Sequence, residues 1–426
     1  MRRRISITAI AIIVMLPIFA SANGLNLNGL GTRAQGMGGA FVSIADDFSA
    51  AFWNPAGAAG FRKKMFGFYA VDLMPRATFR QDLSLPPSRI EAKTPTQHYL
   101  GFLGGYYAPV SEKVVLGLAI GTPSAQGLMW DGQVFADTDG IAYDWSSKVG
   151  VFSFSPLVAV KLNDWLSVGA TLNINLGTFS LKRPGGAQDL GEGPVDLGQY
   201  EESMSGWGFG ATFGILAKPV DKLSVGLTVR TPSTVSFGGL ARLSYLSLYG
   251  LPDSSDLERK ITWPLWIAGG VSFRPFERLL LSADVHWTQW SKLDRITTEY
   301  LDPVWRDLFT MGGVNSTWMI LSWKDATQIR FGAEYSLNPT TALRAGYAND
   351  PAPGPDSTLN ILFPTHTFNV FSIGVGKTIG DLQLDFGLEY LAGNKRTPYS
   401  MLPVLPGPPT YGMTIVAPSV SVQYKF

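Results

Sequence analysis

Cysteine is absent from the 426-residue sequence, and histidine occurs only three times. The lack of cysteine excludes disulfide bonds and thiol chemistry, and His98, His286 and His366 lie too far apart in the sequence to form a metal-ligand motif. Charged residues make up only 16% of the chain, and the formal net charge is +1. A nucleic-acid surface would need an excess of clustered Lys and Arg. We therefore expect no cofactor, no metal site and no nucleic-acid partner.

Long apolar runs are missing beyond the N-terminus. The chain opens with basic residues 2–4, an apolar run over residues 5–19 and small residues at 20–22, which is the pattern of a signal peptide (residues 1–22) cleaved after Ala22. A retained anchor helix is the alternative, but residues 23–24 bring no basic stop-transfer flank. No later stretch reaches the ~18 apolar residues that a transmembrane helix needs. Any later membrane span must therefore consist of β-strands.

Apolar and polar residues alternate along most of the remaining chain. In residues 166–177, Leu, Val, Ala and Ile occupy one phase and Ser, Gly, Thr and Asn the other. A period of two predicts β-strands with one apolar and one polar face. About fourteen segments follow the pattern, an even number as expected of a single-chain barrel. They are residues 61–79, 99–110, 114–121, 149–162, 166–177, 207–218, 223–230, 266–274, 279–290, 328–336, 341–348, 368–378, 382–390 and 414–426.

The connections between these segments alternate between short turns and long loops. Turns such as residues 109–113 and 378–381 carry the Pro, Asp and Gly that tight reversals require. The sorting of lengths is typical of an outer-membrane barrel, which has periplasmic turns and extracellular loops. The predicted loops are residues 80–98, 125–148, 183–203, 239–260, 291–324, 349–367 and 391–409.

A soluble β-protein with a dry core is the alternative explanation of the alternation. Two features favour a membrane: the second face is small and weakly polar, and tryptophans, which prefer membrane interfaces, lie near the strand ends. These are Trp165, Trp207, Trp263, Trp266, Trp287, Trp290 and Trp323. We therefore predict an all-β fold, a transmembrane antiparallel β-barrel of about 14 strands over residues 61–426, in contact with the lipid of the bacterial outer membrane.

The chain ends in an alternating segment that places Val420, Val422, Tyr424 and Phe426 in one phase. A terminal Phe after such a strand is similar to the C-terminal signal that the outer-membrane assembly machinery reads. We expect that machinery as a partner and a monomeric barrel.

Residues 23–60 differ in character, because Gly, Ala and Ser dominate and no long period-two run is present. Glycine-rich backbone permits tight packing and unusual dihedral angles. A phosphate-binding loop is the alternative, but no strand–loop–helix context and no Gly-Lys-Ser/Thr ending occur here. We predict that this segment is a compact plug, or hatch, in the barrel lumen.

A family resemblance is carried by residues 36–41 (Gly-Met-Gly-Gly-Ala-Phe), 45–47 (Ala-Asp-Asp) and 50–57, which contain Asn54-Pro55-Ala56. This order resembles the N-terminal hatch of the FadL-type long-chain fatty-acid transporters. The resemblance implies a fourteen-stranded barrel, a plugged lumen and a lateral opening between strands through which apolar cargo leaves. It also implies that Asn54 and Pro55 hold the plug in shape.

Two groups of residues are candidates for contact with a hydrophobic ligand. The plug aromatics could present an apolar surface, although plain packing inside the plug is the alternative. The apolar loop over residues 239–252 matches the outer groove that the resemblance implies, and packing on neighbouring loops is its alternative. The candidates are Phe41, Phe48, Phe52, Trp53, Leu240, Leu243, Leu246 and Tyr249.

A cargo with a carboxylate would need an inward-facing Arg, since guanidinium pairs bidentately with carboxylate. Arg33, Arg330 and Arg344 are the candidates. The alternative is an ion-pair network with lumen acids such as Glu334, Asp385 and Glu389.

The sequence as a whole predicts passive, plug-gated transport of long-chain fatty acids or hydrocarbons with lateral release. A general diffusion porin is the second hypothesis, but it should have a strongly charged lumen and no glycine-rich insert. An outer-membrane lipid hydrolase is the third, and it would need a Ser–His pair oriented by another residue. His286 has no such pattern near it. We therefore expect no enzymatic activity and no catalytic residue.

Overall fold

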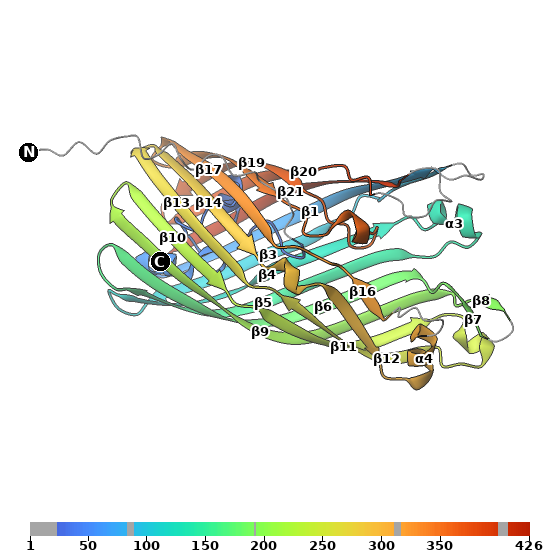
Figure 1. The fold of residues 1–426 in the computed structure, drawn as a ribbon. Helices are drawn as coiled ribbons and strands as arrows, with labels where there is room; N and C mark the ends of the chain where they lie inside the picture. The colour runs from blue at the N-terminus through green and yellow to red at the C-terminus, as the bar shows by residue number, and fades with distance from the viewer. Residues whose placement is uncertain (1–23, 83–88, 191–192, 311–316, 399–407) are drawn as a thin grey trace, which may run out of the picture.

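The computed structural model describes residues 24–82, 89–190, 193–310, 317–398 and 408–426. The predicted signal peptide, residues 1–22, lies outside this set. The described chain forms a closed antiparallel barrel of 14 strand positions (Figure 1). The first and last strands close the wall, with pairs from Met65↔Lys425 to Arg80↔Thr410. The predicted strand number is thereby confirmed.

Two neighbouring wall positions are each built from two consecutive strands, interrupted at residues 231–232 and 264–265. In chain order the wall consists of β1 (Met65–Asp82), β3 (Tyr99–Pro109), β4 (Val114–Trp130), β5 (Trp145–Lys161), β6 (Leu166–Pro184), β9 (Gln199–Val220), β10 (Leu223–Arg230) with β11 (Ser233–Leu243), β12 (Ser254–Trp263) with β13 (Trp266–Phe276), β14 (Leu279–Thr288), β17 (Ala326–Asn338), β18 (Thr341–Asp350), β19 (Phe368–Ile379), β20 (Leu382–Gly393) and β21 (Thr410–Lys425).

Short elements occupy the long connections. They are β2 (Arg89–Lys93), α3 (Gln133–Asp139), β7 (Ala187–Asp189), β8 (Pro194–Asp196), η3 (Leu246–Tyr249), η4 (Trp290–Lys292), β15 (Arg295–Tyr300), α4 (Pro303–Thr310), β16 (Trp318–Ile320) and η6 (Asp356–Thr358). Figure 1 shows α3, α4, β7 and β8 at one end of the barrel and the short turns at the other. No helix in the described ranges is both long and apolar enough to cross a membrane.

The outer face of the barrel wall carries many exposed apolar side chains, whereas charged and polar side chains of the strands face the lumen beside apolar ones. In β6, Leu172 is 51% exposed on the outer face, whereas Asn173 and Asn175, at 9% and 8%, face the lumen. Arg344 and Glu334 also point inward. Because a Lys or Arg on the lipid face at mid-membrane costs about 2–4 kcal/mol, this orientation places the charges where they can be paired.

Several strands are longer than the sequence pattern predicted. Residues 125–130, 145–148, 199–203, 239–243 and 254–260, predicted as loops, belong to β4, β5, β9, β11 and β12. Toward the loop end, inward side chains such as Val149, Phe179 and Leu181 are apolar and join one buried cluster with Trp290 and Trp305 from the connections. The exposed side chains of these extensions include Arg242, Asp256, Glu258 and Lys260, so apolar and polar residues still alternate there, but with the apolar face inside and the polar face outside.

The tryptophan prediction was correct only for part of the set. Trp165 and Trp207 are 51% and 59% exposed on the outside, as an interface residue should be. Trp263, by contrast, donates from its indole to Ser124 across the lumen, and Trp266, Trp290 and Trp323 are buried. These rings fill interior space because they fall on the inward phase of their strands or in the folded connections.

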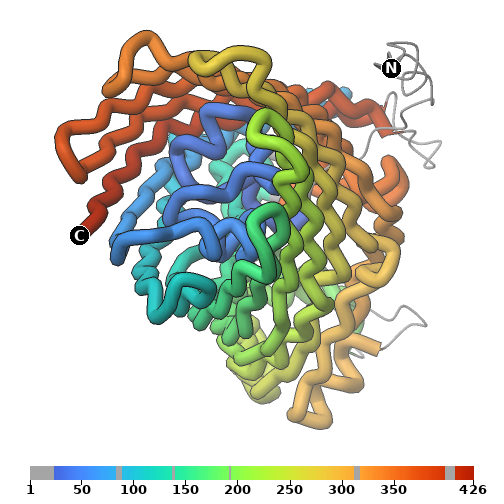
Figure 2. The backbone as a smooth tube through the Cα atoms, turned by 90° about the vertical axis from the view of Figure 1, so that its left-hand side faces the viewer, coloured from blue at the N-terminus to red at the C-terminus, as the bar shows by residue number. Residues whose placement is uncertain are grey.

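Residues 24–60 lie inside the barrel, where Figure 2 shows them in blue, enclosed by the wall. They form α1 (Thr32–Gly36), α2 (Ala50–Trp53) and η2 (Pro55–Gly60). Their apolar side chains pack in one cluster with inward residues of the wall, including Met65, Tyr69, Val115 and Leu157. We call residues 24–60 the plug.

Candidate functional site

Asn54 connects the plug to the wall through a side chain that is fully buried. Its Nδ2 donates to the carbonyl of Val42 at 2.9 Å and to the carbonyl of Ile215 in β9 at 3.0 Å. Its Oδ1 accepts from the main-chain nitrogen of Ala56 at 3.1 Å and so caps η2, with Pro55 at the first position of that helix. The motif therefore makes contacts both within the plug and between the plug and the wall.

Glycines in the wall allow the motif to approach the strands closely. A Cβ atom on Gly214 of β9 would lie 2.0 Å from Asn54 Oδ1, and one on Gly169 of β6 would lie 2.5 Å from the carbonyl carbon of Pro55. Any side chain at these two positions would displace the plug.

An ion-pair network joins the plug to the opposite side of the wall. Arg33 donates bidentately to Glu334 of β17, at 2.7 and 2.9 Å, and pairs with Asp46 in the plug. Glu334 also accepts from Arg344 of β18 at 2.7 Å, and Arg344 donates to Asp385 of β20 at 2.6 Å. Arg33 and Arg344, two of the candidate carboxylate partners of a cargo, therefore lie in the alternative arrangement, an ion-pair network.

Arg330, the third predicted partner, is 1% exposed and its donors are also engaged. It donates to Gln328 Oε1 at 2.7 Å and to the carbonyl of Gly38 in the plug at 3.1 Å. In the plug, burial raises the pKa of the Asp47 carboxyl, although Arg33 and Ser49 act in the opposite direction.

Arg230 at the end of β10 is the basic residue that faces open space. It donates to the carbonyl of Phe52 at 3.0 Å, and its guanidinium carbon lies 4.8 Å from the ring centroids of both Phe52 and Trp266. It lines a cavity whose empty space, including a part open to solvent, is about 800 Å³. We call this the Arg230 cavity.

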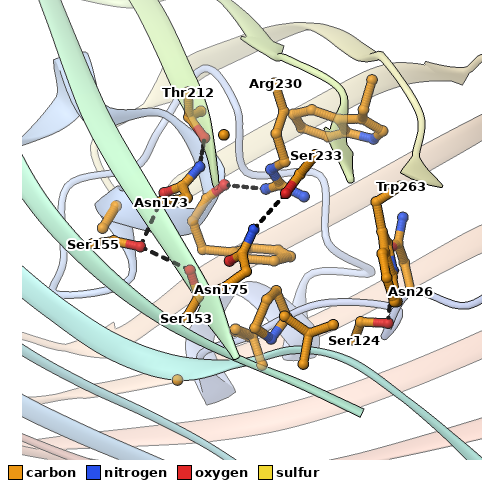
Figure 3. Close-up of a pocket in the computed structure, with 18 of the residues that line it drawn as sticks. Asn26, Ser124, Ser153, Ser155, Asn173, Asn175, Thr212, Arg230, Ser233 and Trp263 are labelled. Atoms are coloured by element: carbon orange, nitrogen blue, oxygen red, sulfur yellow. Dashed lines mark hydrogen bonds between the residues drawn. The ribbon is translucent and has the colours of Figure 1, made fainter. Parts of the chain in front are cut away.

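The Arg230 cavity has one apolar and one polar side. Leu30, Phe52, Leu103 and Trp263 contribute apolar surface. Figure 3 shows the polar side, where Asn175 donates to Ser233 at 2.8 Å near the guanidinium, and Asn173 donates to Thr212 at 2.9 Å. Arg230 is the only charged residue that lines the cavity among the described parts of the chain.

A second cavity of about 920 Å³ lies on the other side of plug residues 26–29. Its walls include Leu27, Val71, Leu73, Phe368, Leu391 and Met413, and its polar lining includes Gln35, Gln126, Asp350, His366 and Glu389. We call it the Glu389 cavity.

The wall between β3 and β4 is incompletely paired next to both cavities. In the described chain, their main-chain pairing ends at Leu103↔Gly121, although β3 continues to Tyr99 on β1 and β4 continues to Trp130 on β5. The β4 ladder has a register shift between Gly121 and Ser124, which is a β-bulge that contains a proline. Beyond this point the two strands are joined by side chains instead of a main-chain ladder: Thr122 Oγ1 bonds the main chain of Phe102, and Gln97 Nε2 donates to the carbonyl of Met129.

The plug covers this gap from the lumen. Asn26 forms an isolated antiparallel bridge with Ser124, and the main-chain nitrogen of Leu27 donates to Pro123 at 3.2 Å. Ser124 Oγ in turn donates to the carbonyl of Leu25. The first plug residues therefore act as a short additional strand on the edge of β4.

The predicted ligand-contacting aromatics of the plug fall into two groups. Phe52 lines the Arg230 cavity. Phe41, Phe48 and Trp53 are at most 2% exposed and pack inside the plug or against the wall, and the indole of Trp53 donates to the carbonyl of Leu30 at 2.7 Å.

The predicted ligand-contacting residues of the loop also fall into two groups, one buried and one exposed. Leu243 and Leu246 are fully buried in the core near the loop end. Leu240 and Tyr249 are exposed at 36% and 41%, and Leu240 lines a groove that also includes the exposed Leu100 and Phe152 and, at the gap, Thr122 and Ser124.

Sequence reasoning missed Arg230, Trp263 and Trp266 as cavity residues. A signal for them exists, because Pro232 and Pro264 interrupt the alternation beside them, and a proline within a strand pattern marks a bulge or a break. The two neighbouring strands are interrupted at the level along the barrel axis at which the cavity lies.

Comparisons with known proteins agree with this architecture. A sequence model of the family described as "Outer membrane protein transport protein (OMPP1/FadL/TodX)" matches residues 13–400. A search of curated protein sequences gave no significant match.

Three solved structures illustrate the likeness of fold. A FadL homologue of Pseudomonas aeruginosa superposes with a TM-score of 0.77 at 16% identity, over 95% of this chain and 100% of that one. The toluene transporters TodX of P. putida and TbuX of Ralstonia pickettii give TM-scores of 0.73 and 0.69, each at 16% identity over 94% of this chain and 99% of theirs. The chain belongs to the OMPP1/FadL/TodX family of outer-membrane transport proteins, whose members include channels for hydrophobic compounds.

Proposed function

We propose that the protein is a passive channel for long-chain fatty acids or hydrocarbons, which leave the lumen sideways between β3 and β4 when the start of the plug moves. The observation that carries this proposal is the end of β3–β4 pairing at Leu103↔Gly121, beside the Arg230 cavity and covered by plug residues 25–27.

The physical argument for a lateral route is the solubility of the cargo. Each CH₂ group gains about 0.8 kcal/mol when it leaves water for an apolar environment. A chain released into the membrane keeps this gain, whereas a chain released into the periplasm loses it. The groove that contains Leu100, Phe152 and Leu240 offers an apolar surface on which the cargo can emerge.

The gate in this proposal is the short strand formed by the first plug residues. Unpaired main-chain groups are costly in hydrocarbon, so the edge of β4 needs a partner while the channel is closed. The contacts of Leu25, Asn26 and Leu27 with Pro123 and Ser124 supply that partner. They are few enough that a ligand entering the Arg230 cavity can displace them.

Arg230 would distinguish two kinds of cargo. A fatty acid can place its carboxylate on the guanidinium and the amides of Asn173 and Asn175, with its chain against Phe52 and Leu103. A hydrocarbon needs only the apolar side. The structural relatives named above include both a FadL homologue and toluene transporters, and either cargo class is compatible with this cavity.

A disulfide lock tests the gate, and the absence of native cysteine makes the experiment clean. Asn26 and Ser124 are antiparallel bridge partners, whose Cα atoms lie about 4.5–5.5 Å apart, a distance that a disulfide spans. We expect oxidised N26C/S124C to lose uptake of labelled oleate and toluene, and reduction to restore it.

The matched control is T234C/T262C, a cross-strand pair whose hydroxyl groups lie 2.8 Å apart in the wall, away from the plug. Its oxidation should leave uptake unchanged. Equal uptake by oxidised and reduced N26C/S124C would refute the gate. Stimulated sugar uptake without lipid uptake would favour a porin, and lipid cleavage by the purified protein would favour a hydrolase.

A further inference from the structure

The side chain of Tyr99 lies between β3 and β4, beyond their last main-chain pair, Leu103↔Gly121. A Cβ atom on Gly127 of β4 would lie 2.7 Å from Tyr99 Cε1 and 3.0 Å from Cζ. The ring therefore packs directly on the main chain of Gly127 and occupies the space that a larger residue there would need. Tyr99 itself pairs with Leu73 of β1. One aromatic ring thus fills the place where the ladder between two wall strands has ended.

The hydroxyl group of Tyr99 holds the ring in this position through a neighbouring amide. Tyr99 Oη donates to Gln97 Oε1 at 2.6 Å, and Gln97 Nε2 donates to the main-chain carbonyl of Met129 in β4 at 2.8 Å. The ring is thereby connected to β4 through two hydrogen bonds between neutral groups. Because neither bond belongs to a strand ladder, the ring can leave Gly127 without breaking a strand pair of the wall.

Tyr99 borders an inner and an outer space at once. It lines the Glu389 cavity inside the barrel, and it also lines the outer groove that contains Leu100 and Phe152. Ala125 and Gln126 of β4 border the same two spaces. The Glu389 cavity and the outer face of the wall are therefore separated at the gap by these three side chains, and Tyr99 is the aromatic one.

Apolar side chains lie on both sides of the Tyr99 ring. Inside, Leu73 and Ile415 line the Glu389 cavity. Outside, Leu100 is 77% exposed and Phe152 is 42% exposed in the groove. An alkyl chain that passes the ring would therefore keep apolar contacts along its length, and each CH₂ group that stays out of water retains its favourable transfer free energy.

We propose that the ring of Tyr99 is a second barrier on the lateral path, in the wall itself: it closes the Glu389 cavity toward the membrane, and that cavity opens to lipid when the ring leaves Gly127. The Glu389 cavity is then the last compartment that cargo occupies before the membrane, after plug residues 25–27 have moved. The inference rests on the proposed function for the place of exit, between β3 and β4. The closure of the cavity by the ring is a property of the resting protein, and its measurement requires no transport.

A single cysteine inside the cavity tests this closure, since the chain has no native cysteine. Ile415 lines the Glu389 cavity and is partly buried, so Ile415→Cys is introduced and the full barrel is reconstituted in liposomes. The rate of labelling is measured with N-(1-pyrenyl)maleimide, which partitions into the membrane, and with a sulfonated maleimide, which stays in water. Adding Tyr99→Ala should raise the rate with the membrane reagent by about tenfold or more, because the cysteine otherwise reacts only when the ring is displaced. The rate with the water-soluble reagent should stay the same.

Two tyrosine variants are the matched controls in the same Ile415→Cys background. Tyr99→Phe keeps the ring and loses only the bond to Gln97, so labelling should stay close to that of the parent. Tyr106→Ala removes an aromatic ring from the lipid face of the same strand, where Tyr106 is 43% exposed and pairs with Leu118, and it should leave both rates unchanged. Tyr99→Val replaces Tyr99→Ala if the latter does not fold, as reported by heat-modified migration in gels.

Three results would overturn the inference: an unchanged rate with the membrane reagent in the folded Tyr99→Ala or Tyr99→Val variant, an equal rise with both reagents, which would indicate a loosened lumen, or equally fast labelling in Tyr99→Phe. The proposed function is tested separately by the N26C/S124C lock. Faster membrane labelling in Tyr99→Ala together with full oleate and toluene uptake by oxidised N26C/S124C would support the barrier at Tyr99 and count against the plug gate. Unchanged labelling together with uptake abolished by the lock would do the reverse.

Discussion

Asn54 of the plug donates from Nδ2 to the main-chain carbonyl of Ile215, 161 positions away in β9, at 3.0 Å. The same nitrogen also bonds Val42, and the same side chain caps η2. One amide thus connects the local fold of the plug with its attachment to the wall.

Replacing this amide should loosen the plug without unfolding the barrel. Asn54→Ala removes the hydrogen bonds to Val42, Ile215 and Ala56, each worth about 1 kcal/mol net, while the strand pairing of the wall is untouched. We expect raised single-channel conductance in planar bilayers and unchanged heat-modified gel migration. A conductance equal to that of the unmodified protein would mean that the amide does not hold the plug.

The close approach at Gly214 gives a steric version of the same test. Gly214→Ala places a Cβ 2.0 Å from Asn54 Oδ1, so the plug must shift, and we expect easier cleavage of residues 24–60 by added protease. Gly238→Ala is the matched control, since a Cβ on Gly238 would have no atom within 4 Å. The prediction is wrong if the two variants are digested at equal rates.

Removal of one carboxylate from the ion-pair network should lower the stability of the protein strongly. Glu334→Ala leaves Arg33 and Arg344 without their shared partner, with side chains only 12% and 3% exposed, and we expect a loss of about 3 kcal/mol in the free energy of unfolding. Denaturant titration followed by tryptophan fluorescence measures it.

A surface pair serves as the comparison for the Glu334 variant. Lys63 and Asp381 pair at 2.8 Å with side chains 54% and 51% exposed, so Lys63→Ala should cost about 0–1 kcal/mol. Equal losses in the two variants would contradict the role of burial in this network.

Arg230 should separate acidic from neutral cargo. Arg230→Gln removes the charge but keeps a polar side chain, so we expect oleate affinity to fall about tenfold and toluene uptake to change little. Arg330→Gln is the control, because the guanidinium of Arg330 is engaged by Gln328 and Gly38. Equal effects on oleate and toluene in Arg230→Gln would show that the head group is bound elsewhere.

Sequence reasoning succeeded where a local pattern carries the information. The alternation in residues 166–177 and the sorted turns were sufficient for the closed barrel, and residues 36–57 carried the family resemblance, because strand periodicity and turn chemistry act over a few neighbouring residues. The loop-end parts of the strands, including residues 239–243, were missed because their apolar face is the inner one and their outer face carries charges such as Arg242, the reverse of the membrane-spanning part.

The tertiary structure alone decided the roles of individual side chains. Arg33, Arg230, Arg330 and Arg344 are alike in sequence, yet only Arg230 lies in a cavity without an acidic neighbour in the described chain, and Phe52 faces that cavity while Trp53 does not. Such differences depend on which residues the barrel register brings together, often more than a hundred positions apart, as Asn28 and Glu389 are. The sequence by itself determined the barrel and its family, because the alternation of side chains along a strand decides which face meets lipid. The charge of each cavity, by contrast, depends on which side chains meet when the wall closes around the plug.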